Sequence, residues 1–253
     1  MPFELDLELF AAGFVSWVIS TLSAGGGSLL ILAAASYLLR GQAVAPVITI
    51  TSLMASPARM IVLWPRIQWR VVGWYLPGAA VGAALGGWVF TRIGSHWIEI
   101  LLAIFLISTI WQYRLGERPR SFRMRLPWFV PVSFLSGLIS AVIGASGLLA
   151  NPFYLNYGLV KEEMLATRAV NSLSIQVVKI ASYWAFGALS WPLLRHGLAA
   201  GFGAVAAVWV ANAWLEFLTA RRFRQLAVLV MVLGGVVLLW KQRRFLEELL
   251  GEV

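Results

Sequence analysis

Apolar residues occur along this chain in long runs, separated by short polar stretches that are rich in arginine. The first apolar region, residues 5–39, is too long for one membrane span of about 20 residues and too short for two. Three consecutive glycines, residues 25–27, divide it, and glycine costs a helix interior about 1 kcal/mol relative to alanine. We therefore expect either a re-entrant helical hairpin or one long broken helix, with pieces of fewer than about 16 residues.

The later apolar runs predict helices that cross a membrane. These helices are expected at about residues 43–64, 71–90, 97–113, 193–217 and 226–240. The run at 71–90 carries glycines at four-residue spacing, a pattern typical of helices that pack closely in membranes. An arginine-rich segment, residues 114–126, lies between two halves of the chain and is expected to be a cytoplasmic linker.

The second half of the chain repeats the plan of the first. Gly144-Ala145-Ser146-Gly147 corresponds to the first glycine-rich break. Beyond the break, a constant shift of 120 positions aligns Ser52 with Ser172 and Arg59 with Lys179. Two homologous repeats, residues 1–113 and 127–253, joined by the linker 114–126, are therefore predicted.

The composition places the chain in the bilayer. It is 60% hydrophobic and 12% charged, whereas soluble domains carry about 25% charged residues. The net charge of +9 is concentrated in short loops, as the positive-inside rule describes, so a nucleic-acid partner is not expected. We predict an all-α integral membrane protein that is multi-pass in the lipid bilayer.

The sequence does not indicate a catalytic site or a metal-binding site. The chain has no cysteine and only two histidines, which lie far apart. There is no Ser/His/Asp set and no pair of carboxylates within a span. We expect no catalytic residue, no metal and no cofactor, and therefore not an enzyme.

The basic loops predict an orientation. If the linker 114–126 and the loop with Arg66 and Arg70 are cytoplasmic, the two repeats are inverted relative to each other. Each repeat then has a glycine-broken or re-entrant helix plus about three spans. A parallel arrangement with eight full spans is the alternative, and the inverted one suits the short pieces of the broken regions better.

Several motifs occur in a characteristic order: Ser-x-Gly-Gly-Gly at Ser23 to Gly27, the pair Thr51-Ser52, and spaced glycines from Leu76 to Gly86. With these motifs and a second half of the same plan, the chain resembles the TauE/SafE family of sulfite and organosulfonate exporters and uptake permeases over essentially its whole length. That family often has a proline soon after the first break, whereas this chain reads Leu-Leu-Ile-Leu at 29–32.

The resemblance implies a secondary transporter of the bacterial cytoplasmic (inner) membrane. Its substrate would be a small sulfur-containing anion, such as sulfite or an organosulfonate, moved by alternating access. A passive anion channel of similar architecture is the alternative function. A homodimer is kept open as the assembly.

Breaks in membrane helices are tolerated where they are buried in protein or line a wet cavity. Helix N-termini at such breaks offer N–H groups and a positive dipole end to an anion. We expect the two breaks to face each other near mid-membrane, although glycines also serve close helix packing alone. The break residues expected to bind substrate are Ser23, Gly25, Gly26, Gly27, Gly144, Ser146, Gly147 and Asn151.

Arg59 and Lys179 are the charged candidates within the spans. A charge inside a bilayer is costly and usually marks a transport pathway, and the alternative is that the long side chain reaches the interface. For Arg168, which is nearer to a span start, the interface is the preferred interpretation. Neutral donors are expected from Ser52, Asn171, Ser172 and Gln176, although hydroxyls in membrane helices often bond their own backbone.

Overall fold

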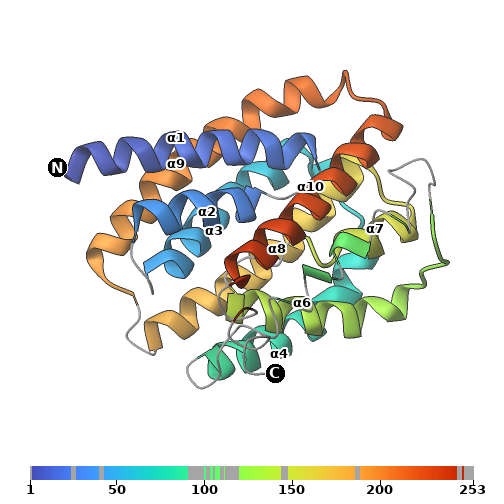
Figure 1. Cartoon of the computed structure of the whole chain (residues 1–253). Helices are drawn as coiled ribbons and strands as arrows, with labels where there is room; N and C mark the ends of the chain where they lie inside the picture. Colours follow the sequence, from blue (N-terminus) through green and yellow to red (C-terminus); the bar gives the residue numbers. More distant parts are fainter. Residues whose placement is uncertain are drawn as a thin grey trace.

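The protein is helical throughout the part of the chain that the computed structural model describes, and that part contains no strand (Figure 1). The described residues are 2–23, 27–39, 43–90, 100, 103–104, 106–108, 111, 120–143, 148–185, 189–243 and 247. The helices are α1 (Pro2–Leu22), α2 (Gly27–Leu38), α3 (Val44–Val62), α4 (Trp69–Phe90), α6 (Phe129–Ile143), α7 (Asn151–Tyr157), α8 (Lys161–Ala185), α9 (Trp191–Leu215) and α10 (Ala220–Lys241). The all-α prediction is confirmed for these residues. By length and composition, Glu4–Leu22, Val44–Val62 and Trp191–Leu215 are apolar enough to cross a membrane.

The first broken region is a helical hairpin, because α2 packs against α1 and turns back along it (Figure 1). The expectation that both pieces are shorter than a span is wrong for α1, which has 21 residues and is about 31 Å long. The helix includes the acidic N-terminal stretch, where Asp6 is held by residues of α9. Arg195 Nε donates to Asp6 Oδ2 at 2.6 Å, and His196 Nδ1 lies 2.7 Å from Asp6 Oδ1.

The second broken region also returns to the side from which it entered. The ring of Phe129, the first residue of α6, lies 5.6 Å from the ring of Tyr154 and 5.5 Å from that of Tyr157, both in α7. Asn156 Oδ1 accepts a hydrogen bond of 2.7 Å from the backbone N–H of Ser121, which precedes α6. The end of α7 therefore lies beside the segment that leads into α6.

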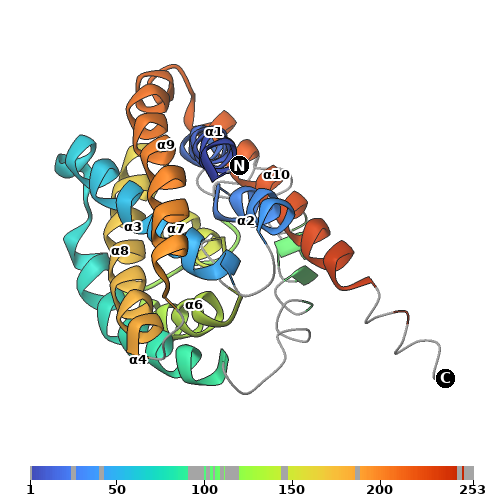
Figure 2. The same ribbon diagram turned by 90° about the vertical axis from the view of Figure 1, so that its left-hand side faces the viewer.

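The two halves of the chain are joined by two similar helix pairs. Helix α1 lies against α9, and α6 lies against α4 (Figure 2). A Cβ on Gly137 of α6 would lie 2.6 Å from the carbonyl oxygen of Ala79 in α4. In the other pair, a Cβ on Gly13 would collide with the carbonyl group of Ala200. Both contacts require glycine, because the backbones approach too closely for a side chain.

The glycine spacing of α4 has the packing role that its pattern predicts. A Cβ on Gly82 would collide with the Phe134 carbonyl of α6, and the corresponding Gly203 of α9 meets the Phe10 carbonyl of α1 in the same way. Gly86 likewise faces the backbone of Leu138. The small residues of α4 therefore lie against α6 and hold the two helices together.

Helices α3 and α8 pack against each other and run in opposite directions (Figure 1). Helix α3 also contacts α9, and α8 also contacts α4, so these two helices connect the glycine-packed pairs. Among the described residues they carry both buried charged side chains, Arg59 and Lys179, and several buried polar ones, including Asn171 and Gln176. A polar interior between apolar outer helices is where a membrane protein holds a solute path.

Candidate functional site

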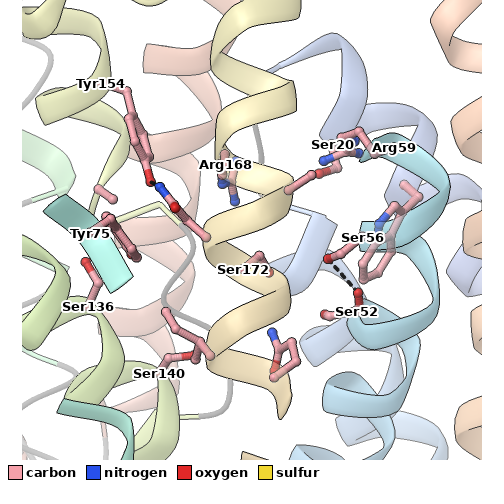
Figure 3. Close-up of a pocket in the computed structure, with 16 residues that line it drawn as sticks. Ser20, Ser52, Ser56, Arg59, Tyr75, Ser136, Ser140, Tyr154, Arg168 and Ser172 are labelled. Atoms are coloured by element: carbon pink, nitrogen blue, oxygen red, sulfur yellow. Dashed lines mark hydrogen bonds between the residues drawn. The ribbon is translucent and has the colours of Figure 1, made fainter. Parts of the chain in front are cut away.

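A polar cavity of about 70 Å³ lies among α1, α3, α4, α6, α7 and α8 (Figure 3). One water needs about 10–15 Å³ on this scale, so the cavity holds several waters or a small ion. Its walls are Trp17, Ser20, Ser52, Ser56, Arg59, Tyr75, Ser136, Ser140, Ala150, Tyr154, Arg168, Ala169, Asn171, Ser172, Ile175 and Gln176.

Helical periodicity brings the polar residues of α3 and α8 to this cavity. Ser52, Ser56 and Arg59 of α3 are four and three positions apart and therefore share one face of that helix. The lining residues of α8 follow the same spacing. Of the candidates predicted from the sequence, the structure brings together Ser52, Arg59, Asn171, Ser172 and Gln176.

Arg59 is buried, with 8% of its surface exposed, and it lines the cavity instead of reaching the interface. Its Nη2 donates a hydrogen bond of 2.9 Å to Thr21 Oγ1, and Thr21 donates one of 2.9 Å to the carbonyl of Trp17. Its Nε is buried with no hydrogen-bond partner among the described residues. The guanidinium is therefore held by α1, and its Nε–H is available to donate to a ligand.

Arg168, which we expected at the interface, lines the same cavity. The physical reason is its position on α8, because it lies four residues before Ser172 and eight before Gln176 and so shares their face. Two guanidinium groups from different halves of the chain thus face one cavity. None of the described residues that line it is an aspartate or a glutamate. The cavity is therefore strongly positive.

An aromatic wall closes the side of the cavity formed by α4 and α7. The rings of Tyr75 and Tyr154 are stacked with centroids 6.2 Å apart. Tyr154 OH accepts a hydrogen bond of 2.7 Å from Asn171 Nδ2. The wall therefore fixes the amide of Asn171, one of the predicted polar candidates.

Sequence reasoning missed several lining residues. They are Trp17, Ser20, Ser56, Tyr75, Ser136, Ser140 and Tyr154. A signal was present for three of them, because Ser136 and Ser140 of α6 lie four residues apart in a mainly apolar run, as Ser56 and Ser52 do in α3. The tyrosines carried no such signal, since single aromatic residues are common throughout the apolar runs.

The other predicted site residues lie away from the cavity or outside the described residues. Lys179 is 1% exposed and does not line the cavity. Asn151 is fully buried beside Ala150, which does line it. Ser23 is buried, and its hydroxyl donates to the carbonyl of Ile19 at 2.6 Å. Gly27 is the first residue of α2, and the remaining break residues, Gly25, Gly26, Gly144, Ser146 and Gly147, are not among the described residues.

No group of three or more potential metal ligands occurs among the residues that the structure describes.

Comparisons with known proteins give a consistent result. The family described as "Sulfite exporter TauE/SafE" matches residues 9–238. The protein named "Probable inner membrane transporter protein TsaS" of Comamonas testosteroni is 32% identical over 94 residues, which cover 36% of this chain and 36% of that relative. No solved structure matches the chain.

Proposed function

Because the chain belongs to the TauE/SafE family, a family of membrane transporters and not of enzymes, we propose that it is a secondary transporter of a small sulfur-containing anion such as sulfite or an organosulfonate. We place it in the bacterial inner membrane, where the name of the relative TsaS places that protein. The observation that carries the proposal is the pair Arg59 and Arg168, which face one cavity whose described lining has no carboxylate.

The two guanidinium groups at the cavity favour a negatively charged substrate. Arg59 is buried, and a buried charge costs several kcal/mol unless it is compensated. Two cations that face one cavity also repel each other. An anion between Arg59 and Arg168 relieves both costs. A guanidinium is planar and binds two oxygens of one group at once, so it matches the oxygens of a sulfite or sulfonate. Serine hydroxyls from four helices, α1, α3, α6 and α8, add neutral polar groups.

We propose that the chain consists of two inverted repeats and that it transports its substrate by alternating access. This proposal is supported by the two hairpins, by the opposite directions of α3 and α8 (Figure 1) and by the similar pairs α1–α9 and α4–α6. Each pair takes one helix from each repeat, and its two backbones are in close contact at the glycines. The moving bodies are therefore the two pairs, and each contains helices of both repeats. The cavity opens to either side as one pair tilts against the other about α3 and α8.

A flux assay in proteoliposomes tests the proposal. Arg59→Ala and Arg168→Ala are expected to lower the uptake of sulfite and of an organosulfonate by at least about tenfold, which corresponds to 1.4 kcal/mol. Arg66→Ala, an exposed arginine outside this cavity, is the matched control. Lys179→Ala tests whether the second charged candidate also contributes. Wild-type flux in both arginine variants would overturn the site.

The same assay separates a carrier from a passive channel. A carrier saturates with substrate concentration and shows exchange of labelled substrate against unlabelled substrate on the other side. A flux that rises in proportion to concentration and shows no exchange would favour the passive anion channel.

A further inference from the structure

Two amide oxygens in the cavity wall have no hydrogen-bond donor among the described residues. They are Asn171 Oδ1 and Gln176 Oε1. Both side chains line the cavity, and they are 1% and 7% exposed. A buried acceptor without a donor costs about 1–3 kcal/mol. Such atoms are uncommon in folded proteins and call for an explanation, of which a ligand is one kind.

These amide oxygens cannot hydrogen-bond to an anion that has only acceptor atoms. An amide oxygen carries partial negative charge and repels the oxygens of a sulfonate. Asn171 has its Nδ2 engaged with Tyr154 OH at 2.7 Å, which leaves Oδ1 as its free group. The cavity therefore combines donors for an anion with acceptors that need an N–H or O–H.

The two kinds of group are spread along the cavity. Arg168 and Gln176 are eight residues apart on one face of α8, about 12 Å along the helix axis. In Figure 3 the labelled arginines lie toward one end of the cavity and Ser52 and Ser140 toward the other. Asn171 is three residues from Arg168, about 4.5 Å along the axis, so a ligand whose negative group lies at Arg168 has one amide close by and that of Gln176 farther along the helix.

Building on the proposed function, we propose that the preferred substrate is an oxoanion that also carries an O–H group. The negative oxygens bind Arg59 and Arg168, and the hydroxyl donates its one proton to the amide oxygen of Asn171 or of Gln176. An ammonium donor is disfavoured, because the lining has two cations and no described carboxylate to balance a third. The O–H is supplied by a hydroxyalkanesulfonate or by singly protonated sulfite.

The experiment measures binding to the purified full chain in detergent by calorimetry. The probes ethanesulfonate, 2-hydroxyethanesulfonate and 2-aminoethanesulfonate share one carbon skeleton and differ in the terminal group. The hydroxylated probe is expected to bind at least about tenfold more tightly than ethanesulfonate and more tightly than the amine. Asn171→Leu and Gln176→Leu are expected to reduce this preference, taken as the ratio of the two affinities within each variant, to less than about twofold. Gln242→Leu, a buried glutamine outside the cavity, is the matched control.

Binding of sulfite tests whether singly protonated sulfite, the second proposed source of the O–H group, is a ligand. Its affinity is measured on both sides of its second ionisation, and ethanesulfonate at the same pH values corrects for titration of the protein. If protonated sulfite is the ligand, affinity rises as the pH falls, and Gln176→Leu removes the rise.

The outcomes separate this inference from the proposed function. Equal affinities for ethanesulfonate and its hydroxylated form, together with sulfite binding that does not change with pH, would overturn the inference but leave the anion transporter. Failure of all these anions to bind would instead overturn the proposed function. If a leucine variant does not fold, Gln176→Met gives a smaller change at the same position, and ethanesulfonate binding reports whether it is folded.

Discussion

Arg59 of α3 is joined to Thr21 of α1 by a hydrogen bond of 2.9 Å from Nη2 to Oγ1. Thr21 lies in the last turn of α1, just before the first glycine-rich break. The contact therefore links the charge of the cavity to the end of the broken helix. A movement of that helix end changes where the guanidinium lies, which is what a substrate-dependent rearrangement requires.

Thr21→Val tests this link, because valine keeps the shape of threonine and removes the acceptor. Arg59 then loses its one identified partner, and we expect the concentration for half-maximal uptake to rise by about tenfold, or 1.4 kcal/mol. Thr51→Val is the control. Thr51 is also buried and its hydroxyl donates to the Val47 carbonyl at 2.8 Å, but it does not line the cavity. Equal half-saturation in both variants would show that Thr21 does not position Arg59.

Gly82→Ala is expected to destabilise the protein, since the added Cβ would collide with the Phe134 carbonyl of α6. Overpacking of this kind costs about 1–3 kcal/mol. Gly73→Ala in the same helix is the matched control, because a Cβ there meets nothing within 4 Å. That variant should be neutral or more stable by up to about 1 kcal/mol. Thermal unfolding in detergent measures both, and equal midpoints would contradict the close packing of α4 on α6.

The elements of the fold followed well from sequence pattern where the pattern was local. The runs at 43–64 and 71–90 became α3 and α4 within about two residues at each end. The glycine break was also placed correctly, since α1 ends at Leu22 and α2 begins at Gly27. The length of α1 was not predicted, because its acidic start is stabilised by Arg195, which is distant in sequence.

The site was predictable only along single helices. Ser52 and Arg59 share a face of α3, and helical spacing is visible in sequence. Tyr75 and Tyr154 reach the cavity because separate helices meet there, and one sequence without relatives does not reveal such a meeting. Arg168 was predicted at the interface because it lies near the start of its helix. The helix face that it shares with Ser172 and Gln176 instead brings it to the cavity.

Asp6→Asn is expected to cost about 1 kcal/mol or less. The variant weakens the contacts to Arg195 and His196 that tie the start of α1 to α9. The loss is small because the Arg195 side chain is 50% exposed, and exposed ion pairs contribute about 0.2–1 kcal/mol. The difference from wild type should shrink at high salt, where charges are screened. Thermal unfolding at low and high salt measures it, with the exposed Glu8→Gln as control. A loss that does not depend on salt would contradict an electrostatic origin.

Asn156 fastens the end of the basic linker to α7. Its Oδ1 accepts hydrogen bonds from the backbone N–H groups of Ser121 at 2.7 Å and Phe122 at 3.0 Å. Its Nδ2 donates to the Pro152 carbonyl at 2.9 Å, and the ring of Phe122 lies 6.0 Å from that of Phe153. This part of the linker contains the exposed residues Arg120, Arg123 and Arg125, which are cleavage sites for trypsin.

Asn156→Ala is expected to speed tryptic cleavage at these arginines several-fold, because the backbone of the linker loses its acceptor and opens more often. Asn156→Asp is the matched variant, since it keeps an oxygen acceptor and loses only the two bonds that Nδ2 donates, to the Pro152 carbonyl and to Ser121 Oγ. It should therefore be cleaved at nearly the wild-type rate. Mass spectrometry of the fragments over time identifies the cut sites. Cleavage of both variants at the wild-type rate would show that Asn156 does not hold the linker. Equal acceleration in both would assign the holding role to the bonds that Nδ2 donates to Pro152 and Ser121.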